Sequence, residues 1–150
     1  MRVVLDTNVL VRAFCAPSGP AKELLQLVTA PPHDLILSPF VIAELHRVMR
    51  YDRVRALHQR DDGWINASIA DLQSTAILIS PIQAPQASVV PFDPDDDPIV
   101  ALAVAGLAQR LATLDRHLRS PAVRAHCGRF GIEVCSDVKL LADLRGQATP

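Results

Sequence analysis

Short apolar runs alternate along this chain with longer segments of helical pattern, which leaves few folds open to it. Runs that are apolar throughout are typical of strands buried on both faces of a parallel sheet. We predict strands at residues 3–5, 34–37, 76–79, 111–114 and 132–135. We predict helices at residues 20–28, 39–50, 64–74 and 99–109, and a short one through residues 140–144. Strands that alternate with helices imply right-handed crossovers, so the expected fold is a three-layer α/β/α sandwich with a mostly parallel central sheet.

The composition fits one globular domain over residues 1–150. Apolar residues make up 49% of the chain and charged residues 21%, which is enough apolar side chain to bury a core. No apolar run approaches the roughly 18 residues of a membrane span, and the N-terminus enters a strand pattern without a signal-peptide layout. We therefore expect a cytoplasmic protein with no membrane contact. Its three cysteines are odd in number and lack CxxC spacing, so we expect buried, reduced thiols.

Two aspartates stand at the carboxyl ends of predicted strands. Asp6 follows the strand at residues 3–5, and Asp115 follows the strand at residues 111–114. In open parallel sheets, ligands bind beyond the carboxyl ends of the strands, where the strand order reverses. Asp6 and Asp115 are therefore candidate site residues.

A glutamate lies on the apolar stripe of a predicted helix. Ser38 and Pro39 predict the start of this helix as an N-cap followed by proline at the first helical position. Glu44 shares a stripe with Val41 and Val48 at helical spacing, and this stripe should face the sheet. A glutamate there either reaches the rim of the sheet or meets a cation.

A third candidate begins the helix that follows the proline-rich loop at residues 81–98. Asp97 precedes an apolar helix, although an aspartate before a proline is also an ordinary N-cap. We expect Asp93, Asp95 and Asp96 to be solvated loop charges. Asp96 remains a rival to Asp97, because helix capping by one of them leaves the other to face a metal.

Together these carboxylates indicate a metal centre. Carboxylates are rarely buried unless they are paired or bind a metal. Four of them at element ends or on a core-facing stripe predict one acidic pocket that binds a hard divalent cation. Such a pocket points to metal-assisted hydrolysis, most directly of a phosphodiester. Thr7, Asn8 and Thr113 adjoin these carboxylates in the sequence and are candidates for orienting them.

The charge distribution gives weak support for a nucleic-acid substrate. The formal net charge is −1, so there is no global basic field. Arginines nonetheless cluster in two stretches, where they could hold phosphates on either side of an acidic centre. The clusters are Arg47, Arg50, Arg53, Arg55 and Arg60, and Arg116, Arg119, Arg124 and Arg129.

These residues carry a resemblance to a known family. Residues 3–10 (VVLDTNVL) resemble the opening motif of PIN-domain nucleases, and residues 37–45 are similar to the segment that bears the family's glutamate. Residues 93–103 and 113–115 resemble its third and fourth acidic motifs. The motifs occur in the family's order over residues 1–145. The closest resemblance is to the compact bacterial, VapC-like toxins of toxin–antitoxin systems.

The resemblance implies an endoribonuclease that uses Mg²⁺ or Mn²⁺ at Asp6, Glu44, Asp97 and Asp115. In the chemistry that we expect, Asp6 and Asp97 bind the main cation and Asp115 binds it directly or through water. Glu44 orients or deprotonates the attacking water. The supporting residues are Thr7, Asn8, Ser38, Thr113 and the rival ligand Asp96. The implied partners are an RNA substrate, a cognate antitoxin protein and a second copy of the chain, for which Trp64 is a candidate anchor.

The sequence also allows other interpretations of the protein's function. Related chains often have a glycine where this one has Leu114, and acidic residues where it has His117 and Gln109. A phosphatase on a similar sheet usually needs a second aspartate two residues after the nucleophile, where Asn8 stands here. The sequence contains no GxxxxGK[ST] motif, which argues against a P-loop enzyme. A non-catalytic module that keeps the fold and binds protein or RNA remains an alternative.

Overall fold

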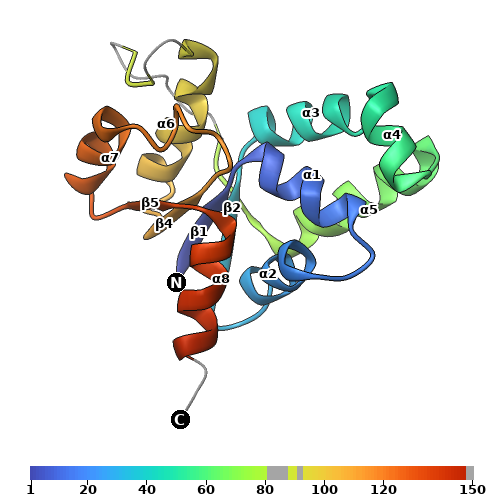
Figure 1. The fold of residues 1–150 in the computed structure, drawn as a ribbon, viewed down its shortest axis with the longest axis horizontal. Helices are drawn as coiled ribbons and strands as arrows, with labels where there is room; N and C mark the ends of the chain where they lie inside the picture. The colour runs from blue at the N-terminus through green and yellow to red at the C-terminus, as the bar shows by residue number, and fades with distance from the viewer. Residues whose placement is uncertain (81–87, 91–92, 148–150) are drawn as a thin grey trace.

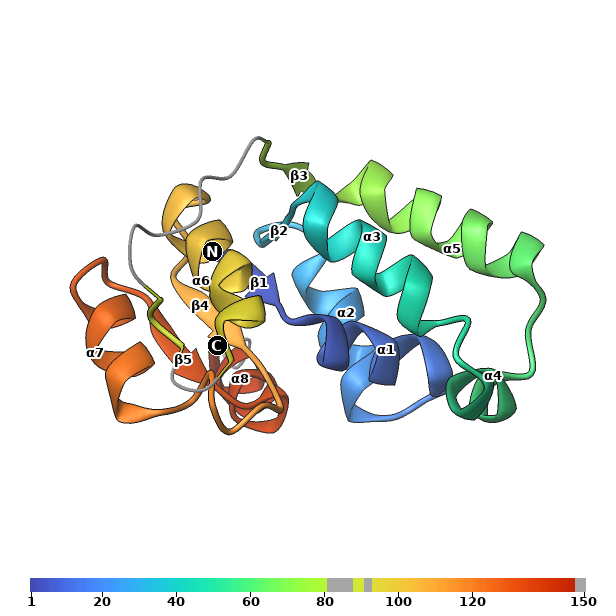
Figure 2. The ribbon, with the colours of Figure 1, turned by 90° about the horizontal axis from the view of Figure 1, so that it is seen from above.

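The computed structural model describes residues 1–80, 88–90 and 93–147. Its centre is a five-stranded, all-parallel sheet with the strand order β3-β2-β1-β4-β5 (Figure 1; β3 is labelled in Figure 2). The strands are β1 (Arg2–Leu5), β2 (Asp34–Leu37), β3 (Ile77–Leu78), β4 (Arg110–Ala112) and β5 (Glu133–Cys135). Helices cover both faces of the sheet, so the predicted α/β architecture is confirmed.

Eight α-helices and one 3₁₀ turn accompany the sheet in the described residues. Ser38 and Ser120 each cap a helix that has proline at its first position, as the local sequence favours. The helices are α1 (Thr7–Cys15), α2 (Pro20–Val28), α3 (Pro39–Val48), α4 (Asp52–His58), α5 (Asp62–Thr75), α6 (Asp97–Ala105), α7 (Pro121–Gly128) and α8 (Asp137–Gln147), with the 3₁₀ turn η1 (Pro94–Asp96) before α6.

Several predicted boundaries differ from the structure. α1, α4 and α7 were not expected, and the helix predicted from residue 99 begins at Asp97. The strand expected at residues 76–79 has only two paired residues, and both are exposed because β3 is an edge strand. Part of the predicted loop at residues 81–98, namely 81–87 and 91–92, lies outside the described residues.

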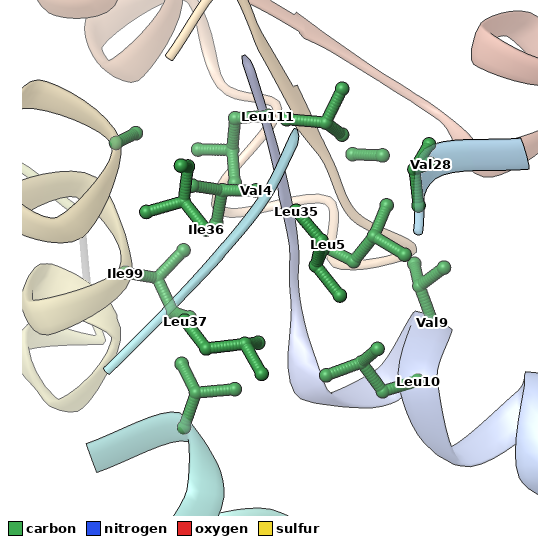
Figure 3. Packing of buried hydrophobic residues seen from close by; sticks show 14 of the residues in the cluster. Val4, Leu5, Val9, Leu10, Val28, Leu35, Ile36, Leu37, Ile99 and Leu111 are labelled. Carbon is green, nitrogen blue, oxygen red and sulfur yellow. The ribbon is translucent and has the colours of Figure 1, made fainter. Parts of the chain in front are cut away.

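The core consists of two apolar layers, one on each face of the sheet. Successive strand residues point to opposite faces, so Val4 and Ile36 face α6 while Leu5 faces α1 (Figure 3). Figure 2 shows α6 and α7 on one side of the sheet and α1 and α2 on the other. α6 approaches β2 closely at Gly106, where an added Cβ would lie 2.7 Å from Ile36 Cγ2. Glycine at this position therefore allows the close packing of α6 on the sheet.

Two further features concern the cysteines and membrane-spanning segments. Cys15, Cys127 and Cys135 are free; Cys127 and Cys135 are buried, as expected, whereas Cys15 is only partly buried. Within the described residues, no helix combines the length and apolarity that crossing a bilayer requires.

Candidate active site

The strand order reverses between β1 and β4. The chain moves from β1 outwards through β2 to β3, then returns to the other side of β1 as β4. The ends of these two strands are joined by a hydrogen bond from Asp6 N to Ala112 O at 2.9 Å. The crevice beyond such a reversal is where open parallel sheets bind ligands.

Asp6 lies at the head of this crevice and is almost completely buried. Its side chain is 5% exposed and it is the N-cap of α1, with Oδ1 accepting the Thr7 N–H at 2.7 Å. The carboxylate therefore also suits the positive end of α1. Its other oxygen accepts the Thr113 hydroxyl at 2.6 Å.

Thr113 connects the carboxylate of Asp6 to the backbone of Asp115. Its hydroxyl is fully buried, donates to Asp6 Oδ2 and accepts the Asp115 N–H at 2.9 Å. Asp115 Oδ1 in turn accepts the His117 N–H at 2.6 Å. Asn8 ties α1 to the same loop, because its Oδ1 accepts the Leu114 N–H at 3.2 Å. These bonds fix the direction of Asp6 and Asp115 relative to each other.

Glu44 reaches the crevice from α3. Ser38 is buried away from the cavity and caps α3 by accepting the Val41 N–H, so it sets where the helix begins. Glu44 is only half-buried, which places it at the rim. Its Oε2 accepts a short hydrogen bond from the Thr7 hydroxyl, and its Oε1 lies 3.4 Å from Arg47 Nη2.

The two rival aspartates have different surroundings. Asp97 is 6% exposed, and its Oδ1 accepts the backbone N–H groups of Val89 and Val90, both at 2.9 Å. It therefore ties residues 89 and 90 to the start of α6. Asp96 occupies the N-cap position of α6 but makes no capping hydrogen bond, so its carboxylate is available to the crevice.

One cavity of about 300 Å³ gathers the acidic side chains. Asp97 and Ser38 do not line it. Its lining consists of four carboxylates from four parts of the chain, two polar residues, three valines and one arginine. These residues are Asp6, Glu44, Asp96, Asp115, Thr7, Asn8, Val11, Val48, Val54 and Arg53. Asp93, which we expected to be a solvated loop charge, also has a carboxylate oxygen within 4.8 Å of those of Asp96 and Asp115.

The carboxylates perturb one another's ionisation. Burial raises the pKa of Asp6 to about 6, with further increases from Glu44 and Asp115, while the Thr113 and Thr7 hydrogen bonds oppose the change. Burial likewise raises the pKa of Asp96 to about 7, and Asp6, Asp93, Asp115 and Glu44 add to the increase. Asp96 thus experiences the negative charge of every other carboxylate of the crevice.

The donor set fits a divalent metal ion. It consists of oxygen atoms only, which is what hard cations such as Mg²⁺ and Mn²⁺ prefer. Burial and mutual repulsion both disfavour the ionised carboxylates, and a divalent cation offsets both effects. Asp96, Asp115 and Asp93 are close enough to share one ion, and Asp6 and Glu44 border the same cavity.

Comparison with known families identifies the chain. The family model described as "PIN domain" matches residues 2–117, which is well over half of the sequence. The chain belongs to the PIN domain family. PIN domains are generally nucleases that use divalent metal ions, in agreement with the acidic crevice. No curated protein and no solved structure matches the chain.

Sequence reasoning missed two features of this PIN domain's crevice. Arg53 was one member of an arginine cluster, and nothing in the sequence distinguished it from its neighbours. Asp93 was expected to be a solvated charge, because the sequence alone does not show that it lies beside Asp96 and Asp115.

The helix α1 was also missed, although the sequence contains a signal for it. Asp6 is a capping residue, and Val9, Leu10 and Ala13 follow it with the apolar spacing of a helix.

Proposed function

We propose that this PIN domain is a metal-dependent endoribonuclease that hydrolyses RNA phosphodiester bonds in the four-carboxylate cavity. One observation carries the proposal: carboxylates from β1–α1, α3, η1 and the loop after β4 line one cavity of about 300 Å³ at the strand-order reversal. Burying them together without a cation raises the pKa of two of them, which costs stability in the apo protein.

Asp96 replaces Asp97 in our assignment of the metal ligands. Asp6, Asp96 and Asp115 would hold Mg²⁺ or Mn²⁺. Asp93 could be a further ligand, because one of its carboxylate oxygens lies within 4.8 Å of those of Asp96 and Asp115. Asp97 Oδ1 is already engaged by two backbone N–H groups, and the residue does not line the cavity. Its role in the proposal is structural, because it ties residues 89 and 90 to the start of α6, next to Asp96.

A bound divalent ion supplies positive charge to the phosphate and lowers the pKa of water in the site. The chain's own residues provide the orientation. Thr113 donates to the Asp6 carboxylate, as outer hydrogen bonds commonly do for metal-binding carboxylates, and it accepts the backbone N–H of Asp115. Glu44 lies at the rim, held by the Thr7 hydroxyl, where it would orient the attacking water or accept its proton.

The proposal is tested by incubating the wild-type protein and Asp6→Asn with single-stranded RNA. We expect internal cleavage by the wild type in Mg²⁺ or Mn²⁺, loss of cleavage in EDTA, and no cleavage by the variant. Cleavage that survives EDTA, or that Asp6→Asn retains, would refute the metal mechanism. Metal binding without any RNA cleavage would instead favour a non-catalytic PIN-fold module or another phosphohydrolase.

We further propose that the protein acts in the cytoplasm as the toxin of a toxin–antitoxin pair. The support is the order of the acidic motifs over nearly the whole chain, which resembles that of VapC-like toxins. Induced expression should arrest growth of a bacterial host, and co-expression of a small neighbouring gene should relieve the arrest. Growth that induction leaves unchanged would contradict the toxin role.

A homodimer is part of the same proposal, but Trp64 has intramolecular partners. Its ring packs edge-on against Phe14 with centroids 6.2 Å apart and stacks on His58 at 5.9 Å. Trp64→Ala should therefore lower stability rather than dissociate a dimer. Light scattering of the wild type at high micromolar concentration tests the dimer itself, and a monomeric mass would refute it.

A further inference from the structure

Building on the proposed nuclease function, we propose that Arg53 contacts the scissile phosphodiester of the bound RNA from the α4 side of the acidic cavity. Arg53 lies in the first turn of α4 and is exposed to solvent. It borders the cavity with Asp6, Glu44, Asp96 and Asp115, and it is the one basic residue among the described residues that line it.

Arg53 is not committed to another partner in the way its neighbours are. Among the described residues, it forms neither an ion pair nor a side-chain hydrogen bond, and its Cζ lies 6.0 Å from the centroid of the Tyr51 ring. Three other arginines of this stretch have polar side-chain partners. Arg47 pairs with Glu44, Arg50 bonds Asn66 at 2.7 Å, and Arg55 bonds Asp62 at 2.5 Å. Arg60, like Arg53, lies against an aromatic ring, with its Cζ 5.5 Å from the centroid of the Trp64 ring, but it does not line the cavity.

The position of Arg53 is set by the packing of α4. The next residue, Val54, is buried and lines the same cavity. At the other end of the helix, the His58 ring accepts the Arg60 N–H at Nδ1, so Nε2 carries the proton and donates to Met49 O at 2.9 Å. These contacts fix α4 to the end of α3, so Arg53 is held beside the cavity on a packed element.

The charge of the cavity explains why an arginine is useful there. The four carboxylates that line the cavity can carry up to four negative charges, whereas one divalent cation supplies two positive charges, so the metal alone does not neutralise a site that must also accept a phosphodiester. A guanidinium offsets this repulsion and matches the two non-bridging oxygens of a phosphate in a bidentate contact. Because Arg53 is not paired with the cavity carboxylates, it can make this contact without breaking an ion pair.

The test compares Arg53→Ala and Arg53→Lys with Arg55→Ala. The control removes the same charge from the same helix, but from a side chain that pairs with Asp62 instead of lining the cavity. Binding is followed by fluorescence anisotropy of a labelled single-stranded oligoribonucleotide in Ca²⁺, and cleavage of the same RNA is followed in Mn²⁺. Titration calorimetry with Mn²⁺ and circular dichroism report metal affinity and folding for each variant.

We expect Arg53→Ala to weaken RNA binding by about 10- to 100-fold, as removal of a hydrogen bond to a charged group does. The slope of log affinity against log salt concentration should fall by about 0.7, the value for one phosphate contact on a single strand. Arg53→Lys should recover part of the affinity, and Mn²⁺ affinity should stay unchanged. Arg55→Ala should bind and cleave RNA within about two-fold of the wild type.

Each other outcome has a definite meaning. If Arg53→Ala binds and cleaves RNA like Arg55→Ala, or if it loses Mn²⁺ affinity, the phosphate contact is refuted even where the wild type is an active nuclease. If RNA binding depends on Arg53 but the wild type does not cleave, the phosphate contact stands and the proposed nuclease function fails. If the wild type neither binds nor cleaves RNA, both are refuted.

Discussion

Replacing Asp6 by asparagine should stabilise the apo protein at neutral pH while removing its activity. Asp6 is 5% exposed, and no basic side chain pairs with it among the described residues, so its charge destabilises the fold unless a cation is bound. An asparagine is nearly isosteric, and its side-chain oxygen can still accept the Thr7 N–H that caps α1. The substitution therefore removes the charge and leaves the local geometry intact.

The size of the effect follows from the pKa of Asp6, which burial raises from 3.8 to about 6. At about 1.4 kcal/mol for each pKa unit, ionised Asp6 destabilises the folded protein by about 3 kcal/mol. The Thr113 and Thr7 hydrogen bonds already lower this pKa, so their support of the ionised form is included, and we expect Asp6→Asn to gain about 2–3 kcal/mol. The pKa is higher in the folded state, so the penalty is complete above pH 6 and disappears as the pH falls towards 3.8.

Urea unfolding in EDTA at pH 7.5 and at pH 4 measures this difference. Asp137→Asn is the matched control: Asp137 is 3% exposed, starts α8 and bonds the next N–H, but it also pairs with Arg12 at 2.9 Å. The control should lose about 1–3 kcal/mol, because it removes a bond between charged groups. If Asp6→Asn is less stable than the wild type at pH 7.5, the charge of Asp6 supports the fold and our reasoning is wrong.

Two further predictions concern the metal ligands and their support. Added Mn²⁺ should raise the melting temperature of the wild type and of Asp97→Asn by similar amounts, and it should raise that of Asp96→Asn much less. An equal rise in all three proteins would contradict the choice of Asp96 as the ligand. Thr113→Val should lower stability by about 1–3 kcal/mol, because it leaves Asp6 Oδ2 and the Asp115 N–H without a buried partner. It should also weaken Mn²⁺ binding about 10- to 100-fold, and Thr113→Ser should restore both.

The parts of the fold that local sequence encodes were predicted well. Residues 20–28 and 34–37 form a helix and a strand with the predicted bounds, because a proline start and a short apolar run are local signals. The start of α7 has a local signal that we overlooked. Ser120 and Pro121 repeat the N-cap and proline pattern of Ser38 and Pro39, but we interpreted this arginine-rich stretch as a connection. α4 begins at a residue without a side-chain cap, so its start has no such signal.

The site residues likewise fall into those that local sequence could place and those that it could not. Asp6 and Asp115 could be placed from sequence because strand ends in a parallel sheet meet at one edge, and Glu44 from its position on the α3 stripe. From the sequence we chose Asp97 over Asp96 as the metal ligand, but the difference between the two residues depends on a contact that the local sequence does not encode. Asp97 Oδ1 accepts the N–H groups of Val89 and Val90, and no local pattern encodes that pairing.

Anomalous diffraction from a crystal of the wild-type protein soaked in MnCl₂ would test the metal site itself. We predict a peak inside the cavity, within about 2.5 Å of carboxylate oxygens of Asp6, Asp96 and Asp115. Asp97 should keep its hydrogen bonds to Val89 and Val90 and stay out of the coordination sphere. A cavity without manganese at millimolar concentration, or a peak coordinated by Asp97 in place of Asp96, would contradict the metal centre proposed above.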